Sequence, residues 1–62
     1  MSYDRPTANR KAKETSLKQL NDDICVVSYG DGSYTVVSSS TLNTKNGRIV
    51  RKYFNGIIIW DI

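Results

Sequence analysis

The 62-residue sequence contains no histidine and a single cysteine, Cys25. Histidine is the commonest general base in enzymes, so its absence removes the usual means of activating a nucleophile near neutral pH. A Cys/His zinc site cannot form, and one cysteine cannot make an internal disulfide. Cys25 lies between Ile24 and Val26, where the expected role is that of a small, partly buried hydrophobic side chain. We therefore expect no enzymatic activity, no metal site and no cofactor.

Long apolar runs are also missing from the sequence. The longest, Ile57 to Trp60, falls far short of the roughly 20 residues that a membrane helix needs. Residues 1–16 contain no apolar segment typical of a secretory signal, and a lone cysteine fits a reducing compartment. We expect a soluble cytoplasmic protein that has no membrane contact and no small-molecule substrate.

Basic charge is concentrated in the first third of the chain. The net charge is +3, and residues 1–20 carry five basic residues against two acidic ones. The remaining basic residues cluster between positions 45 and 52, in "KNGRIVRK". Acidic partners such as nucleic acid therefore have two segments that could attract them.

The composition changes near residue 22, where a polar, basic segment gives way to β-branched and aromatic residues. Thr7 is suited to cap a helix, and Ala12, Leu17 and Leu20 form a narrow apolar stripe. We predict a flexible basic tail over residues 1–7 and one small domain over residues 8–62. Within that domain we expect a helix at about 8–21 and a sheet at about 24–62, with the helix docked on the sheet through its stripe.

Three turn signals punctuate the second part of the chain: Asp31-Gly32, Asn46-Gly47 and Asn55-Gly56. Such pairs favour two-residue type I′ turns, which need positive φ at both positions. The runs between them are rich in β-branched and aromatic residues, as strands are. The pattern predicts antiparallel hairpins from four or five strands, at 24–29, 34–39, 42–45, 48–54 and 57–61.

Two of these turns also predict strand register. With Asp31-Gly32 as the turn, Tyr29 faces Tyr34 across the first hairpin. With Asn55-Gly56 as the turn, residue 53 faces residue 58, and Arg51 faces Trp60. Because side chains alternate between the two faces of a sheet, each turn also assigns the residues of its strands to faces.

The terminal segment "IIIWDI" places large apolar side chains on both faces of one strand. A half-solvated strand would alternate apolar and polar residues. One short helix can cover only one face of a sheet. The other face must therefore be hidden by closure of the sheet into a small barrel or by contact with another molecule.

The predicted fold is α+β, with a short N-terminal helix and a four- or five-stranded antiparallel meander. A helix followed by such strands resembles the Sm-like and other SH3-like small barrels in topology. That resemblance implies a curled sheet; it rests on no shared motif, and no residue or function is transferred from it.

We expect a non-catalytic binding protein, a regulator or inhibitor that acts by protein–protein contact or self-association. Small proteins without catalytic residues are common among phage and mobile-element accessory proteins, and we consider that origin as a hypothesis. The interface candidates are Phe54, Ile57, Ile59, Trp60 and Ile62. The alternative is a small nucleic-acid-binding protein that uses a basic arm and a basic hairpin. Its candidate residues are Arg10, Lys11, Lys13, Lys45, Arg48, Arg51 and Lys52.

Overall fold

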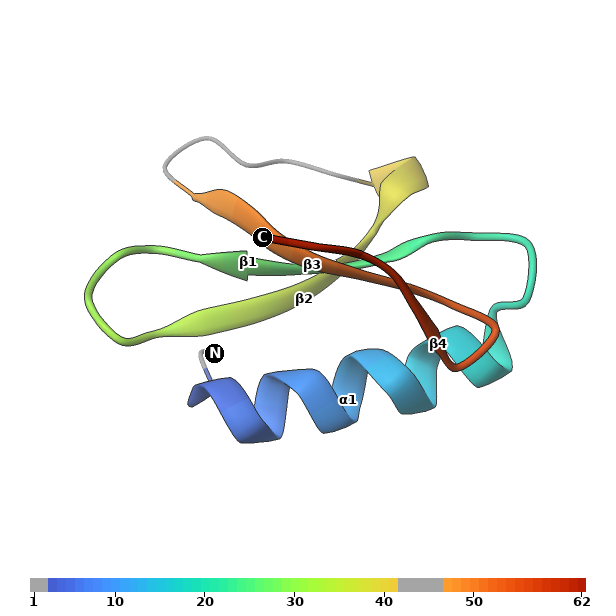
Figure 1. Ribbon diagram of the computed structural model, residues 1–62, viewed down its shortest axis with the longest axis horizontal. Coiled ribbons are helices and arrows are strands. Elements are labelled where there is room, and N and C mark those ends of the chain that lie inside the picture. The colour runs from blue at the N-terminus through green and yellow to red at the C-terminus, as the bar shows by residue number, and fades with distance from the viewer. Residues whose placement is uncertain (1–2, 42–46) are drawn as a thin grey trace.

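The computed structural model describes residues 3–41 and 47–62, which form one helix and four strands (Figure 1). The helix is α1 (Arg5–Lys18), and a short 3₁₀ turn spans Ser39–Thr41. The strands are β1 (Ile24–Ser28), β2 (Tyr34–Ser38), β3 (Arg48–Phe54) and β4 (Ile57–Asp61), all antiparallel to their neighbours. The predicted α+β class is confirmed. The predicted strand at 42–45 and the first residue of the Asn46-Gly47 turn lie outside the described residues.

Helix α1 begins earlier in the sequence than the prediction placed it, and it ends earlier as well. Asp4 is the N-cap, and its carboxylate accepts a 3.0 Å hydrogen bond from the Thr7 N–H. Pro6 occupies the first turn, where its missing N–H has no helical partner to lose. The helix ends at Lys18, with the Gln19 N–H donating to the Thr15 carbonyl. The predicted start at residue 8 is therefore wrong, because Asp4 rather than Thr7 caps the helix, and the predicted end at residue 21 lies three residues beyond Lys18.

Residues 3–7, which the sequence analysis assigned to a flexible tail, carry the cap and the first helical turn. Tyr3 also forms an antiparallel bridge with Tyr34 through two backbone hydrogen bonds of 2.8 and 2.9 Å. Its side chain packs against the core, and the Arg5 guanidinium lies 5.9 Å from the centre of the Tyr34 ring. The start of the helix is thus fastened to the outer edge of β2.

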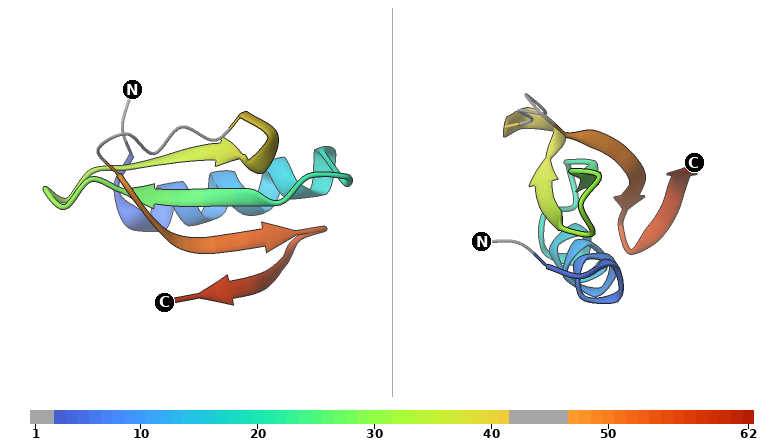
Figure 2. Two further views of the ribbon diagram at one scale, coloured as in Figure 1. Left: turned by 90° about the horizontal axis from the view of Figure 1, so that it is seen from above. Right: turned by 90° about the vertical axis from the view of Figure 1, so that its left-hand side faces the viewer.

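Helix α1 docks on the sheet through small side chains. Ala8, Ala12 and Ser16 are fully buried, and they recur every four residues along one side of the helix. Leu17 and Leu20, the larger members of the predicted stripe, are 52% and 51% exposed. They do not form the main contact with the sheet, although the Leu17 side chain lies against Gly56 in the turn after β3. Alanine and serine let the helix backbone approach the sheet closely, and the helix packs over β1, β2 and β3 (Figure 2).

The sheet has the strand order β2-β1-β3-β4, which is not the order of a meander. The chain leaves β2, crosses β1 and enters β3 on the other side of β1, so β1 lies at the centre. Four consecutive β1 residues, Ile24 to Val27, are fully buried on both faces. In the part of the chain that the structure describes, β2 and β4 are the two ends of an open sheet, and closure into a barrel, which the sequence left open as one arrangement, is not found.

Gly47 packs on the face of β1 that lies away from the helix. A Cβ atom at Gly47 would lie 2.3 Å from Cγ1 of Val27 and 3.0 Å from Cε1 of Tyr29. Only glycine fits at this distance, because real Cβ atoms do not approach other carbons so closely. The described end of the β2–β3 connection therefore covers part of the second face of the sheet.

The β1–β2 hairpin forms as predicted, but its register differs. Tyr34 is paired with Ser28 rather than with Tyr29, because the connecting loop spans residues 29–33. Gly30 and Gly32 both have positive φ (84° and 88°), and the Asp31 carboxylate accepts a 3.0 Å hydrogen bond from the Ser33 N–H. The longer loop shifts the hairpin by one residue relative to a two-residue turn.

Candidate protein-interaction site at the C-terminal edge strand

Strand β4 lies at one end of the sheet, outside the area covered by the helix. Each of its five residues is exposed, and among the described residues it pairs with β3 alone. Helix α1 packs mainly over the other three strands, so within residues 3–41 and 47–62 neither face of β4 has a covering layer like that over β1. The views in Figure 2 show β4 curving away from the rest of the sheet.

The turn that leads into β4 is the one that the sequence predicted best. Asn55 and Gly56 have φ values of 52° and 79°, as a type I′ turn requires, and Phe54 is paired with Ile57. The turn is fastened to the helix, because the Gly56 N–H donates a 2.9 Å hydrogen bond to the Ser16 hydroxyl. That hydroxyl in turn donates a 2.7 Å bond to the Lys13 carbonyl.

A β-bulge at Ile59 changes the register along β4. Tyr53 is paired with Ile58 as predicted, but Lys52 is paired with Trp60 and Arg51 with Asp61. Ile59 is the extra residue. The predicted pairing of Arg51 with Trp60 is therefore wrong, and Trp60 shares a face with Lys52 rather than with Arg51.

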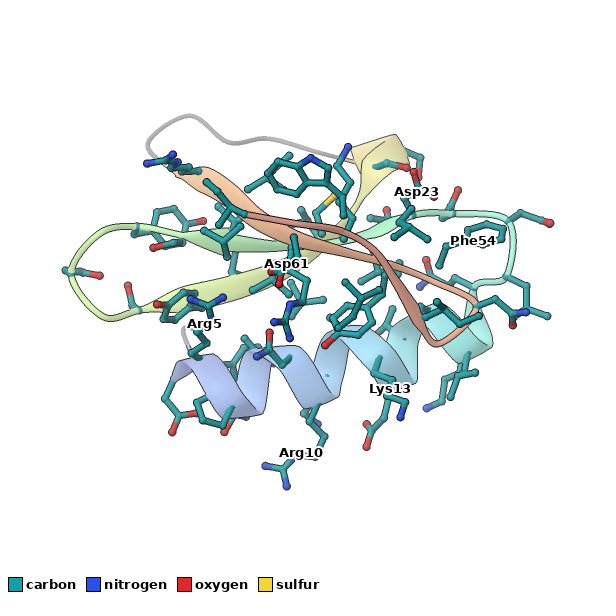
Figure 3. The ribbon with its side chains drawn as sticks, viewed as in Figure 1. Arg5, Arg10, Lys13, Asp23, Phe54 and Asp61 are labelled. Carbon is teal, nitrogen blue, oxygen red and sulfur yellow. The ribbon has the colours of Figure 1, made fainter. Side chains whose placement is uncertain are left out.

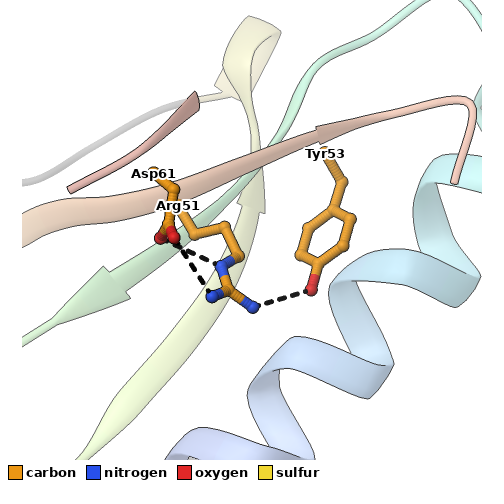
Figure 4. Close-up of polar contacts among 3 residues, drawn as sticks. All are labelled: Arg51, Tyr53 and Asp61. Atoms are coloured by element: carbon orange, nitrogen blue, oxygen red, sulfur yellow. Dashed lines mark hydrogen bonds and ion pairs between the residues drawn. The ribbon is translucent and has the colours of Figure 1, made fainter. Parts of the chain in front are cut away.

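The bulge places Asp61 directly beside Arg51 (Figure 4). Arg51 Nε and Nη2 donate to the two Asp61 carboxylate oxygens at 3.1 and 3.4 Å, and Nη1 donates to the Tyr53 hydroxyl at 3.3 Å. The hydrogen bond from Arg51 lowers the pKa of Asp61, and the reverse interaction raises the pKa of Arg51. The only charged side chain of β4 is thus neutralised within the chain.

All five interface candidates from the sequence are exposed: Phe54, Ile57, Ile59, Trp60 and Ile62, with exposed fractions from 39% to 64%. Ile58, which the sequence analysis did not select, is exposed as well. It pairs with the buried Tyr53, so it faces the helix side but lies beyond the helix. The run of three isoleucines was the signal for it, and the selection took only Ile57 and Ile59 from that run.

The basic candidates do not form one surface. Arg10, Lys11 and Lys13 are exposed on α1, and Arg10 and Lys13 point away from the sheet (Figure 3). Arg51 is paired with Asp61, while Lys52 lies on the opposite face, between Cys25 and Trp60 in the ladder. Arg48 is exposed at the start of β3, and Lys45 lies outside the described residues. The basic hairpin expected at 45–52 is therefore split between the two faces of β3 where it is described.

Three features of the structure are relevant to catalysis: the Cys25 thiol, the groups that could bind a metal ion, and the surface hollows. The Cys25 side chain is fully buried, and burial raises the pKa of its thiol, although the nearby Lys52 cation opposes this. Residues 3–41 and 47–62 include no group of three side chains that could hold a metal ion. A hollow of about 560 Å³ between α1 and β2 is lined largely by polar side chains, with Lys11 and Asp22 as its charged members.

Comparison with known proteins adds no relative. No protein-family model matches the sequence, no curated protein is significantly similar to it, and no solved structure matches its fold. Within the described ranges, no helix has the length and apolar character to cross a membrane. Function is therefore inferred from the site itself.

Proposed function

We propose that this protein is a small non-catalytic binding protein, a regulator or inhibitor that acts by protein–protein contact through β4. The observation that carries the proposal is that β4 combines apolar side chains on both faces with a backbone edge that no other described strand pairs with. Unpaired N–H and C=O groups at a sheet edge are a template for a further strand. Proteins use this mode widely to bind extended segments of partners, with side chains providing the specificity.

The two edges of the sheet differ in a way that supports β4 as the binding edge. Tyr3 occupies part of the outer edge of β2 through its bridge to Tyr34. Strand β4 carries none of the usual protection against pairing except its single bulge, since it has no lysine or proline and its one acid is paired with Arg51. An exposed apolar edge of this kind is an interaction site or an aggregation liability.

Nucleic-acid binding remains the competing hypothesis, and the exposed Arg10, Lys11 and Lys13 on α1 are the observation that favours it. Three cations on one helix can contact phosphates without reading sequence. Affinity that comes from phosphate contacts falls steeply between about 50 mM and 200 mM salt, whereas an apolar edge responds little to salt.

The test uses three forms of the protein: wild type, Ile59→Lys and Leu20→Lys. Ile59 and Leu20 are 50% and 51% exposed, so both variants place the same charge at an equally exposed apolar position, on β4 and away from it. We expect wild type and Leu20→Lys to select apolar, β-forming peptides from a displayed random library, and Ile59→Lys to select none.

The same three proteins are then mixed with a short labelled duplex at low and moderate salt. Selection of the same peptides by Ile59→Lys, or no selection by any form, would overturn the proposal. If wild type binds the duplex in a salt-sensitive way, and Lys11→Glu and Lys13→Glu abolish that binding, the functional surface is helix α1 rather than β4.

A further inference from the structure

We infer that the partner of β4 is a second copy of this chain, paired edge to edge and antiparallel about a two-fold axis at Ile58. This inference rests on the proposed function, since it names the partner of the same site. The resulting sheet would have the order β2-β1-β3-β4-β4′-β3′-β1′-β2′, where primes mark the second copy.

The apolar side chains on both faces of β4 indicate which kind of strand would pair with its edge. A strand that binds beside β4 extends both faces of the sheet. Both faces offer apolar side chains there, with Phe54, Ile57 and Trp60 on one and Ile58, next to the Arg51–Asp61 pair, on the other. A half-exposed strand of another protein would offer apolar residues on one face only. Strand β4 itself offers them on both, so a second copy matches it on each face.

Backbone geometry places the two-fold axis at Ile58. Ile57 follows the two-residue turn and pairs with Phe54, so its N–H and C=O point toward β3. Orientation alternates along a strand, and the N–H and C=O of Ile58 therefore point to the outer edge. Pairing centred there sets Ile58 against Ile58′ and brings Ile57 next to Ile59′, the bulge residue, where the regular alternation of the strand is interrupted. The three isoleucines then face three isoleucines, as cross-strand pairs of β-branched residues favour.

Charge repulsion between the two copies is weak at this interface. Asp61 is the only charge on β4 and is held by Arg51 of the same chain, so no unpaired like charges meet. The exposed cations Arg10 and Lys13 point away from the sheet (Figure 3). Net repulsion between two copies of charge +3 is therefore not focused at the interface, and it weakens as salt screens it.

Symmetry makes the assembly close at two copies. A two-fold interface uses the same patch on both partners and leaves none of it free. The outer ends of the combined sheet would be β2 and β2′, where Tyr3 already occupies part of the edge. The five residues of β4 span about 17 Å. We expect a contact of this length to bury less than the roughly 800 Å² per partner of a standard interface. The dimer should therefore be reversible, with a micromolar or weaker Kd.

Disulfide trapping tests the register as well as the contact. Directly opposed residues of antiparallel strands have Cα atoms about 4.5 to 5.5 Å apart, within the range for a disulfide. Native Cys25 is fully buried and does not compete. We expect Ile58→Cys to form a disulfide-linked dimer under mild oxidation, and Ile57→Cys to link with Ile59→Cys when the two are mixed. Ile57→Cys alone and the exposed control Leu20→Cys should remain monomeric.

Sedimentation equilibrium up to millimolar concentration supplies the independent measurement. We expect a monomer–dimer equilibrium whose Kd rises about tenfold or more in Ile59→Lys, because the dimer would bury an unpaired charge, and is unchanged in Leu20→Lys. Circular dichroism melts confirm that each variant is folded. A monomer throughout, a dimer indifferent to Ile59→Lys, or equal trapping of Leu20→Cys would overturn the inference. If the peptides selected by wild type still depend on Ile59, only the second copy is refuted; if none are selected, the proposed function falls as well.

Discussion

The hydrogen bond between Ser16 and the β3–β4 turn gives the sharpest test of how β4 is positioned. The Ser16 hydroxyl is fully buried, accepts the Gly56 N–H at 2.9 Å and donates to the Lys13 carbonyl at 2.7 Å. Ser16→Ala removes the acceptor and leaves the Gly56 N–H without it. Because alanine differs from serine only by the loss of the hydroxyl group, the substitution introduces no clash.

The magnitude follows from two opposing terms. Leaving a buried donor unsatisfied costs about 1–3 kcal/mol, and the lower half of that range applies because the Gly56 N–H is only partly buried. Alanine is a better helix former than serine by roughly 0.5 kcal/mol, which offsets part of the loss. We expect a net loss of about 1 kcal/mol in the free energy of unfolding. For a domain of this size, that corresponds to a fall in Tm of about 4–8 °C.

Two measurements check this expectation. Thermal melts give the global loss, and Lys13→Ala serves as the control on the same helix, since Lys13 is exposed and contributes its carbonyl rather than its side chain. Hydrogen exchange gives the local effect, and we expect the Gly56 amide to exchange faster in Ser16→Ala by more than the global loss explains. A variant as stable as wild type, with unchanged exchange at Gly56, would refute the reasoning that Ser16 holds the turn.

Three further predictions follow from single features of the structure. Gly47→Ala should lower the free energy of unfolding by about 1–3 kcal/mol in urea titrations, because its Cβ would lie 2.3 Å from Val27 Cγ1; an unchanged midpoint would contradict the packing. The Arg51 hydrogen bond holds the folded-state pKa of Asp61 below its ordinary 3.8, so the stability from this pair is fully present above that value and is lost as the pH falls through the folded pKa. Asp61→Asn should remove this component of the acid dependence, and a carboxyl that titrates at 3.8 or higher in an NMR titration would count against it. Cys25 should react with a thiol reagent only as fast as the protein unfolds, because it is fully buried and its pKa is raised; immediate labelling would disagree.

Local signals were sufficient to predict most of the secondary structure. The β-branched runs and turn dipeptides located all four described strands to within a residue or so, and Asn55-Gly56 gave the right turn and the right first pairs. These features depend on neighbours in sequence, where backbone preference decides the conformation. For the terminal apolar residues the sequence left two alternatives, closure of the sheet over one face and a face left for another molecule, and in the structure these residues are exposed.

Features that depend on contacts distant in sequence were not predictable in the same way. The crossover from β2 to β3 depends on which strand lies beside β1, and turn signals carry no information on that choice. The helix docks through Ala8, Ala12 and Ser16, whereas periodicity arguments search for large apolar residues and so selected Leu17 and Leu20. Tyr3 packs against β2, a strand about 30 residues away in the sequence, and no local pattern marks that contact.

The bulge at Ile59 affects both how stably β4 is held and which side chains its outer edge presents. Without it, the register set by the turn would place Asp61 opposite the buried Val50, where a carboxylate has no partner, and would leave Arg51 opposite Trp60. One extra residue moves Asp61 onto Arg51 and transfers Trp60 to the face of Lys52. The cost is one unpaired residue in the ladder. The result is an edge strand whose only charge is satisfied internally and whose remaining side chains are all apolar and exposed. Apolar side chains that face water at an unpaired edge favour the addition of a second strand. Loss of the Arg51–Asp61 pair should therefore alter association at β4 as well as folding.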